Sequence, residues 1–228
     1  MKHDALRKAL DAGLWFSQLA PDLQAVLLEI GELRGLAAGE VLFRRGDKPC
    51  GLYAVLKGAV RIGAVNRQGR EAMLLRIEPP FWFGEIAVFD GQPRTHDATA
   101  DVATQLLHLP HAALLARIDA QPRLWHALGL LMSQKLRMTF GALEEISLLP
   151  SSARLARRLA IIAAGYGETE GVRHRIRLSQ EQLAQMLGLS RQTTNQLLKE
   201  LEAQGTIRLA YGQIDILDLD TLRRLGRG

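Results

Sequence analysis

Residues 81–95 read FWFGEIAVFDGQPRT, and the rest of the chain can be understood outward from them. Gly84 and Glu85 open an apolar turn, which closes on Arg94 and Thr95. Gly84 permits close approach of the backbone to a ligand. If the apolar turn is a short helix, its first N–H groups favour an anion beside Gly84. Arg94 and Thr95 add a guanidinium fork and a hydroxyl, which suit a phosphate.

Glu85 limits which phosphate fits. A carboxylate beside a phosphate is unfavourable unless it accepts hydrogen bonds from hydroxyls, which a ribose supplies. At these residues the sequence resembles the phosphate-binding cassette of cyclic-nucleotide-binding domains, specifically that of the cyclic AMP receptor protein (Crp/Fnr) family of bacterial transcription regulators. The resemblance implies ligand contacts from six residues: Gly84, Glu85, Ile86, Ala87, Arg94 and Thr95. The alternative is a glycine-rich surface turn with a solvated arginine.

Before the cassette, the spacing of the apolar residues changes from a helical pattern to a pattern of short strands. Residues 4–12 and 21–33 have helical spacing. From Gly35 onward, short apolar runs alternate with turns that contain glycine, at positions 46, 58 and 69. Such a series is typical of a β-sandwich, barrel or jelly roll. Residues 43–58 resemble the early strands of the cyclic-nucleotide β-roll. We therefore expect an α+β protein whose residues 1–121 form a cyclic-nucleotide-binding β-roll (jelly roll).

Composition narrows the class of protein. The 228 residues are 47% hydrophobic and 23% charged, as in soluble globular proteins of two domains. Without an apolar run of membrane length or a signal-peptide pattern in residues 1–20, we expect a cytoplasmic protein. Cys50, the single cysteine, excludes an internal disulfide and an iron–sulfur cluster held by cysteines of one chain. It is expected to be a small residue in a turn.

Residues 122–149 predict one long helix with two apolar stripes. Leu124, Leu128, Leu131 and Met138 can pack on the β-roll. The second stripe steps by four and three residues, which is the seam of a coiled coil and predicts a two-fold homodimer. Its residues are Trp125, Gly129, Met132, Leu136, Thr139, Leu143 and Ile146.

Thr139 has a second interpretation. In the resembled family this helix carries a Thr-Ser pair that contacts the adenine, the serine coming from the partner chain. Thr139 matches the threonine, but Phe140 replaces the serine. A threonine hydroxyl can serve adenine or guanine, and a phenyl ring can stack on a base. We favour cyclic AMP as the ligand, with cyclic GMP as the alternative. Thr139 can alternatively be a small residue of the coiled-coil seam that contacts no ligand.

Residues 150–228 predict a winged helix-turn-helix. Ser179 and Gln182 form a capping box, Gly188 ends the first helix, and Ser190 caps the second. Alternating apolar residues in 207–216 predict the hairpin of the wing. This part holds 12 basic and 8 acidic residues, a modest excess that suits DNA.

The second helix begins with polar residues, and such N-terminal residues of a recognition helix reach base edges in the major groove. Arg191 suits guanine, whereas Gln192 or Gln196 suits adenine. Thr193 is expected to pack inward or meet a phosphate. The family motif has glutamate at Gln192 and arginine at Gln196, so the operator should differ. The predicted DNA contacts are Ser179, Ser190, Arg191, Gln192, Thr193, Thr194, Asn195, Gln196 and Lys199.

These parts predict a homodimeric regulator that binds a palindromic operator in double-stranded DNA under allosteric control by a cyclic nucleotide. The predicted domains are 1–121, the dimerisation helix 122–149, and 150–228. In the family, the surface that corresponds to loop 168–171 can touch RNA polymerase. One alternative is a regulator of the same fold that responds to haem or another signal, or needs no ligand. A remote alternative is a cyclic phosphodiester hydrolase using Glu85 and His96, but we expect no enzyme and no metal.

Overall fold

The computed structural model describes residues 3–65, 68, 71–167, 169 and 171–227. The chain divides into two compact units, Met1–Leu136 and Arg137–Gly228, and the boundary falls inside the long helix α6 (Arg123–Leu148). The predicted turn at Gly69 and two residues of the predicted polymerase-facing loop, Glu168 and Glu170, lie outside the described residues. Within the described ranges, no helix is both long enough and apolar enough to cross a membrane.

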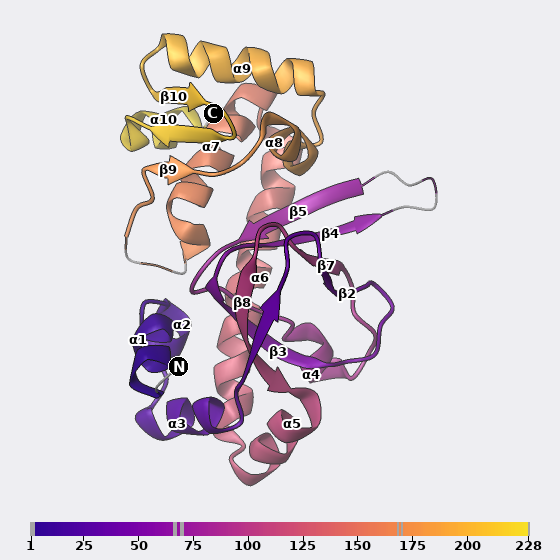
Figure 1. Ribbon diagram of the computed structural model, residues 1–228. Coiled ribbons are helices and arrows are strands. Elements are labelled where there is room, and N and C mark those ends of the chain that lie inside the picture. The colour runs from indigo at the N-terminus through magenta and orange to yellow at the C-terminus, as the bar shows by residue number, and fades with distance from the viewer. Residues whose placement is uncertain (1–2, 66–67, 69–70, 168, 170, 228) are drawn as a thin grey trace. The chain divides into compact units, whose positions relative to one another are not determined.

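The first unit opens with three helices and continues as two antiparallel sheets (Figure 1). The helices are α1 (His3–Asp11), α2 (Leu14–Ser17) and α3 (Pro21–Glu29). In spatial order, one sheet contains β1 (Glu32–Leu36), β8 (Thr104–Pro110), β3 (Gly51–Lys57) and β6 (Trp82–Phe83). The other contains β2 (Val41–Phe43), β7 (Asp97–Ala100), β4 (Val60–Val65) and β5 (Glu71–Ile77). The predicted β-roll is confirmed.

Two details of this unit differ from the sequence-based expectation. The helix predicted over 21–33 ends at Glu29, because residues 32–36 pair with β8 from Glu32↔His108 to Leu36↔Thr104. Strand pairing over five residues outweighs the local helical pattern there. The sequence reading also missed the short α2 and the helix α5 (His111–Ala120).

The core of the first unit joins the α1–α3 helices, the roll and the start of α6. Trp82 is fully buried, with its ring 5.0 Å from that of Trp15, and the Trp15 Nε1 donates to the Ala127 carbonyl at 2.7 Å. Leu124, Leu128 and Leu131 are buried in the same cluster. Their predicted packing on the β-roll is therefore confirmed, whereas Met138 is half-buried and does not belong to this cluster.

The second unit is a winged helix-turn-helix. Its elements after α6 are α7 (Ser151–Ala163), η1 (Gly165–Gly167), β9 (Arg175–Ile176), α8 (Gln180–Leu187), α9 (Arg191–Ala203), β10 (Ile207–Ala210), β11 (Gln213–Ile216) and α10 (Leu219–Leu225). The capping box at Ser179 is present, and Gly188 ends α8 with a positive φ of 64°. The wing strands pair from Ile207↔Ile216 to Ala210↔Gln213. Strand β9, which the sequence reading missed, adds to β11.

A buried glutamate near the end of α6 forms ion pairs with two arginines of α7. Glu145 is 4% exposed, and its Oε1 lies 2.8 Å from the Arg157 Nε. The Arg158 Nη2 lies 4.0 Å from the other carboxylate oxygen. Because a buried carboxylate is stable only with such partners, the ion pairs favour one angle between the last turns of α6 and the start of α7.

Candidate functional site

The cassette lies in the roll, where β6 leads into the short helix α4 (Ile86–Asp90). Glu85 is its N-cap residue, and Gly91 ends it with a φ of 63°. The N–H groups of Val88 and Phe89 donate to the Glu85 carbonyl, at 3.0 and 3.2 Å. The apolar turn is therefore a short helix, which is the condition on which the anion site depends, and the N–H groups of its first two residues precede its first hydrogen bonds.

Arg94 is the buried cation of the cassette, with 4% of its surface exposed. Its Nη1 donates to the Gly84 carbonyl at 3.0 Å, and its Nη2 donates to the Gly51 carbonyl at 2.6 Å. The guanidinium carbon lies 4.3 Å from the centre of the Phe43 ring. In the described part of the chain no carboxylate pairs with Arg94, and its buried Nε has no acceptor. A guanidinium buried among neutral partners favours an anion. The reading of Arg94 as a solvated side chain is wrong.

The position of the Arg94 guanidinium requires a glycine at residue 84. Its φ is 102°, a conformation that side chains disfavour. A Cβ at this position would lie 2.9 Å from the Arg94 Nη1 and 2.9 Å from the Gly51 carbonyl oxygen. Glycine therefore allows the guanidinium to lie against the backbone at the start of the cassette.

Glu85 is buried to the same extent, 4% exposed, and is held by a residue that the sequence reading missed. The Lys135 Nζ on α6 lies 2.6 Å from the Glu85 Oε2 and donates to the Trp82 carbonyl at 2.6 Å. The ammonium group neutralises the carboxylate and orients it. Because 50 positions separate the two residues, no sequence spacing indicates this pair.

Thr95 lies at the exposed edge of the cassette, where its hydroxyl is 2.9 Å from the His96 Nδ1. Burial, and next the charge of Arg45, lower the pKa of His96, so the ring is mostly neutral at neutral pH. The Asp97 carboxylate accepts the backbone N–H of Arg45 at 2.7 Å. Ile86 is exposed, whereas the side chain of Ala87 is buried.

A second group of residues that the sequence reading missed contacts Arg94. The Cys50 sulfur accepts the Arg94 Nη2 at 3.0 Å and the Tyr53 hydroxyl at 3.3 Å. The Tyr53 ring stacks on His108, whose Nε2 lies 2.7 Å from the Cys50 carbonyl oxygen. Burial, and then the hydrogen bond to Cys50, raise the pKa of Tyr53, so its hydroxyl keeps its proton. Cys50 therefore does more than fill a turn.

Helix α6 carries exposed apolar side chains from its middle to its end. Leu136, Phe140, Leu143 and Ile146 are each more than half exposed. Thr139 is also exposed, and Gly129 and Met132 are half-buried. Trp125 is an exception among the predicted seam residues, because its ring packs 5.0 Å from that of Phe89 in the same chain. We correct its placement to the side of the helix that faces α4.

Helix α9 presents most of the polar residues of its first half to solvent. Arg191, Gln192, Thr193, Gln196 and Lys199 are exposed, and Asn195 is half-buried. Gln192, Asn195, Gln196 and Lys199 line an open hollow of about 460 Å³ together with Glu200 and Ala203. At the start of α9, Ser190 Oγ accepts the Thr193 N–H at 3.0 Å. At the start of α8, Ser179 is half-buried and caps the helix.

Thr194 is a correction, because it is 0% exposed and cannot be a base reader in this conformation. The helix turns Thr194 inward beside Leu198 and leaves Thr193 outside, so Thr193 does not pack inward and its alternative contact with a phosphate stays a prediction. The residue that packs is thus the one four positions before Leu198, as helical spacing requires.

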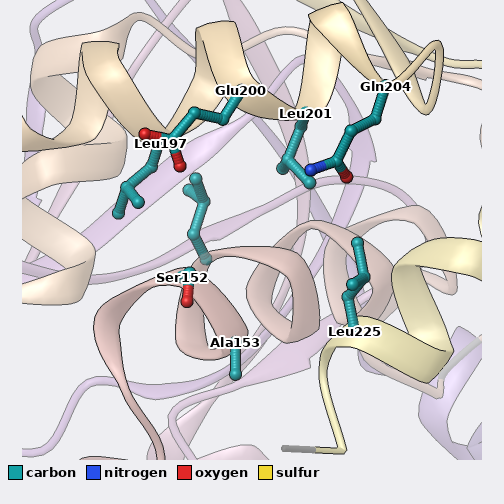
Figure 2. Close-up of a pocket in the computed structure, with 8 residues that line it drawn as sticks. Ser152, Ala153, Leu197, Glu200, Leu201, Gln204 and Leu225 are labelled. Atoms are coloured by element: carbon teal, nitrogen blue, oxygen red, sulfur yellow. The ribbon is translucent and has the colours of Figure 1, made fainter.

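The inner side of α9 borders a separate cavity of about 260 Å³. Figure 2 shows Leu197 and Leu201 pointing from α9 toward α7, with Leu225 of α10 at one side and Glu200 and Gln204 at the rim. None of the predicted DNA contacts lines this cavity. The outer and inner sides of α9 therefore differ in chemistry, polar outside and largely aliphatic inside.

Comparison with known proteins agrees with both units. The family model of the cyclic nucleotide-binding domain matches residues 33–121, and that of the Crp-like helix-turn-helix domain matches residues 153–225. The chain is 30% identical over 214 residues to a CRP-like cAMP-activated global transcriptional regulator of Mycobacterium tuberculosis, covering 93% of this chain and 96% of that one. It is 29% identical over 214 residues to the cyclic AMP receptor protein of Thermus thermophilus, with the same coverage.

A solved structure gives the same result. A transcriptional regulator of the CRP/FNR family from Thermus thermophilus is 30% identical, with a TM-score of 0.69 over 86% of this chain and 99% of that one. The chain therefore belongs to the Crp/Fnr family of transcription regulators, with a cyclic nucleotide-binding domain followed by a DNA-binding helix-turn-helix domain.

Proposed function

We propose that this protein is a homodimeric transcription regulator that binds its operator when a cyclic nucleotide, favoured to be cyclic AMP, occupies the β-roll. One observation carries the ligand assignment: Arg94 is buried beside the start of α4, and its partners among the described residues are all neutral. A cyclic phosphate would supply the missing negative charge to Arg94, with Thr95 and the first N–H groups of α4 as further donors.

The sugar is assigned to Glu85. Its carboxylate is fixed by Lys135, and one oxygen remains to accept a hydrogen bond from a ribose hydroxyl. The names of the relatives from Mycobacterium tuberculosis and Thermus thermophilus refer to cyclic AMP, which supports the same class of ligand here. We assign base selectivity to Thr139 and Phe140 on α6, with cyclic GMP as the competing ligand.

The switch is a shift between two states of the dimer. A ligand changes this equilibrium only by the difference between its affinities for the two states. We divide the chain into a roll (1–121), a dimerisation helix (122–149) and a DNA-binding domain (150–228). The ligand and the DNA then bind at separate sites. We assign the contacts with double-stranded DNA to Ser179, Ser190, Arg191, Gln192, Thr193, Asn195, Gln196 and Lys199. A contact with RNA polymerase belongs to the same proposal.

The proposal excludes hydrolysis. The relatives are transcription regulators, and the acids that an acid–base mechanism would need have other partners, since Glu85 pairs with Lys135 and Asp97 accepts the Arg45 N–H. Incubation of the protein with cyclic AMP, with and without a divalent metal, should leave the nucleotide intact.

Calorimetric titration of the full-length protein tests the ligand. We expect heat from cyclic AMP at one site per chain, and weaker binding or none with cyclic GMP. The affinity for a palindromic operator should rise in parallel when the favoured nucleotide is present. No heat from either nucleotide, together with operator binding that neither of them changes, would favour a regulator of the same fold that responds to another signal.

Replacement of Gln192 tests the reading of DNA. Gln192→Glu should move the preference at one base pair of each half-site from adenine toward cytosine, because a carboxylate accepts from the cytosine amino group. A matched pair of base and side chain is worth about 1–3 kcal/mol, so selection from a randomised operator library should show a change of roughly tenfold. Lys199→Ala is the control, since loss of a phosphate contact weakens all sequences alike. An unaltered base preference in Gln192→Glu would remove Gln192 from the reading residues.

A further inference from the structure

The sulfur of Cys50 is part of the surroundings of the Arg94 guanidinium. The Arg94 Nη2 donates to it at 3.0 Å and the Tyr53 hydroxyl at 3.3 Å. Cys50 is half-buried, so part of the residue is open to solvent. A partly exposed sulfur in an electropositive place is the usual setting of a cysteine that reacts.

Arg94 gives independent reason to expect an anion at this sulfur. The residue is 4% exposed, its buried Nε has no acceptor among the described residues, and its cation has no carboxylate partner there. Its Nη2 divides its donors between the Gly51 carbonyl and the Cys50 sulfur. Any negative group formed on the sulfur would therefore meet an arginine that no carboxylate of the described residues neutralises.

We propose that Cys50 is an oxidation site for hydrogen peroxide, and that its oxidised forms compete with the nucleotide phosphate for Arg94. This inference rests on the proposed cyclic-nucleotide function. In the first step the sulfur attacks one peroxide oxygen, an S–O bond forms and the O–O bond breaks. The thiol proton ends on the departing hydroxide, so thiol and peroxide give sulfenic acid and water. A second peroxide gives the sulfinic acid and another water.

Competition follows from the geometry. Each oxygen added to the sulfur brings an acceptor into the region that Nη2 already reaches across 3.0 Å. A sulfinate is also an anion, and charge-assisted hydrogen bonds to a guanidinium are about twice as strong as neutral ones. The oxidised residue would thus supply the negative charge that the nucleotide phosphate supplies in the reduced protein. Conversely, a bound nucleotide should shield Cys50.

The test measures nucleotide binding before and after oxidation. Reduced wild-type protein is titrated with cyclic AMP and cyclic GMP, treated with hydrogen peroxide, desalted and titrated again, while peptide mass spectrometry follows oxygen gain at Cys50. We expect the affinity to fall about tenfold or more, as for the loss of one hydrogen bond to a charged group. Nucleotide present at saturation should slow the oxygen gain.

Cys50→Ser separates this residue from other oxidisable side chains, including the five methionines. Its affinity before peroxide serves as its own reference, and peroxide should leave that affinity unchanged. If oxidised wild-type protein binds as well as the reduced protein, or if Cys50 gains no oxygen, the Cys50 inference is overturned while the nucleotide function stands. If the reduced protein binds neither nucleotide, the proposed function is overturned, and the inference with it.

Discussion

Replacement of Arg94 by alanine is expected to lower the affinity for the cyclic nucleotide by about 100-fold or more. Loss of one member of a buried, hydrogen-bonded charge pair costs about 2–5 kcal/mol, and each 1.4 kcal/mol is a factor of ten. Arg94 should lie at the upper end, because its other partners in the cassette are the neutral carbonyls of Gly84 and Gly51 and the Cys50 sulfur. Titration calorimetry measures the loss directly.

Two matched variants test the specificity of this effect. Thr95→Ala removes an exposed hydroxyl and should cost about tenfold, the lower limit for a hydrogen bond to a charged group. Arg45→Ala removes an exposed cation from the neighbouring loop and should change the affinity less than Thr95→Ala does. Thermal unfolding shows whether Arg94→Ala keeps the fold. A folded Arg94→Ala that binds within threefold of the wild type would reject the assignment of the phosphate to Arg94.

The parts of the site that could be predicted from sequence are those that are contiguous along the chain. Gly84, Glu85 and Arg94 lie within a dozen positions, and their order alone indicates a phosphate cradle. The capping box of α8 is likewise local. The Ser179 hydroxyl accepts the backbone N–H of the residue three positions later, and the amide side chain of that residue accepts the Ser179 backbone N–H. Local chemistry of this kind needs no knowledge of the fold.

The missed parts come from distant segments that the fold brings together. Lys135 reaches Glu85 across 50 positions, and Cys50 meets Arg94 across 44. Both pairings depend on how β3 and α6 lie beside the cassette, which no periodicity encodes. The error at Thr193 and Thr194 is different, since it concerns the phase of a short helix. One residue corresponds to a rotation of about 100°, enough to exchange a buried and an exposed threonine.

Replacement of Leu143 by aspartate is expected to convert the dimer into monomers. Leu136, Phe140, Leu143 and Ile146 recur every three or four residues on α6, and all four are more than half exposed. A row of exposed large apolar side chains marks an interface. In a two-fold dimer of parallel helices, the aspartates of the two chains would face each other in apolar surroundings. Analytical ultracentrifugation at micromolar concentration should show the change in mass.

Loss of the dimer should also lower the affinity for DNA, although the residues that read the bases are unchanged. Two linked reading helices gain about 10²–10⁴ in affinity over one, so Leu143→Asp should weaken binding to a palindromic operator by at least about 100-fold. Its binding to a single half-site should stay close to that of the wild type. Arg137→Asp is the control, because it places the same charge on α6 about 120° away from Leu143, outside the apolar row. If Leu143→Asp stays dimeric and keeps full operator affinity, the subunits make contact elsewhere. If Leu143→Asp is monomeric while Arg137→Asp stays dimeric, the subunit contact lies on the apolar row of α6.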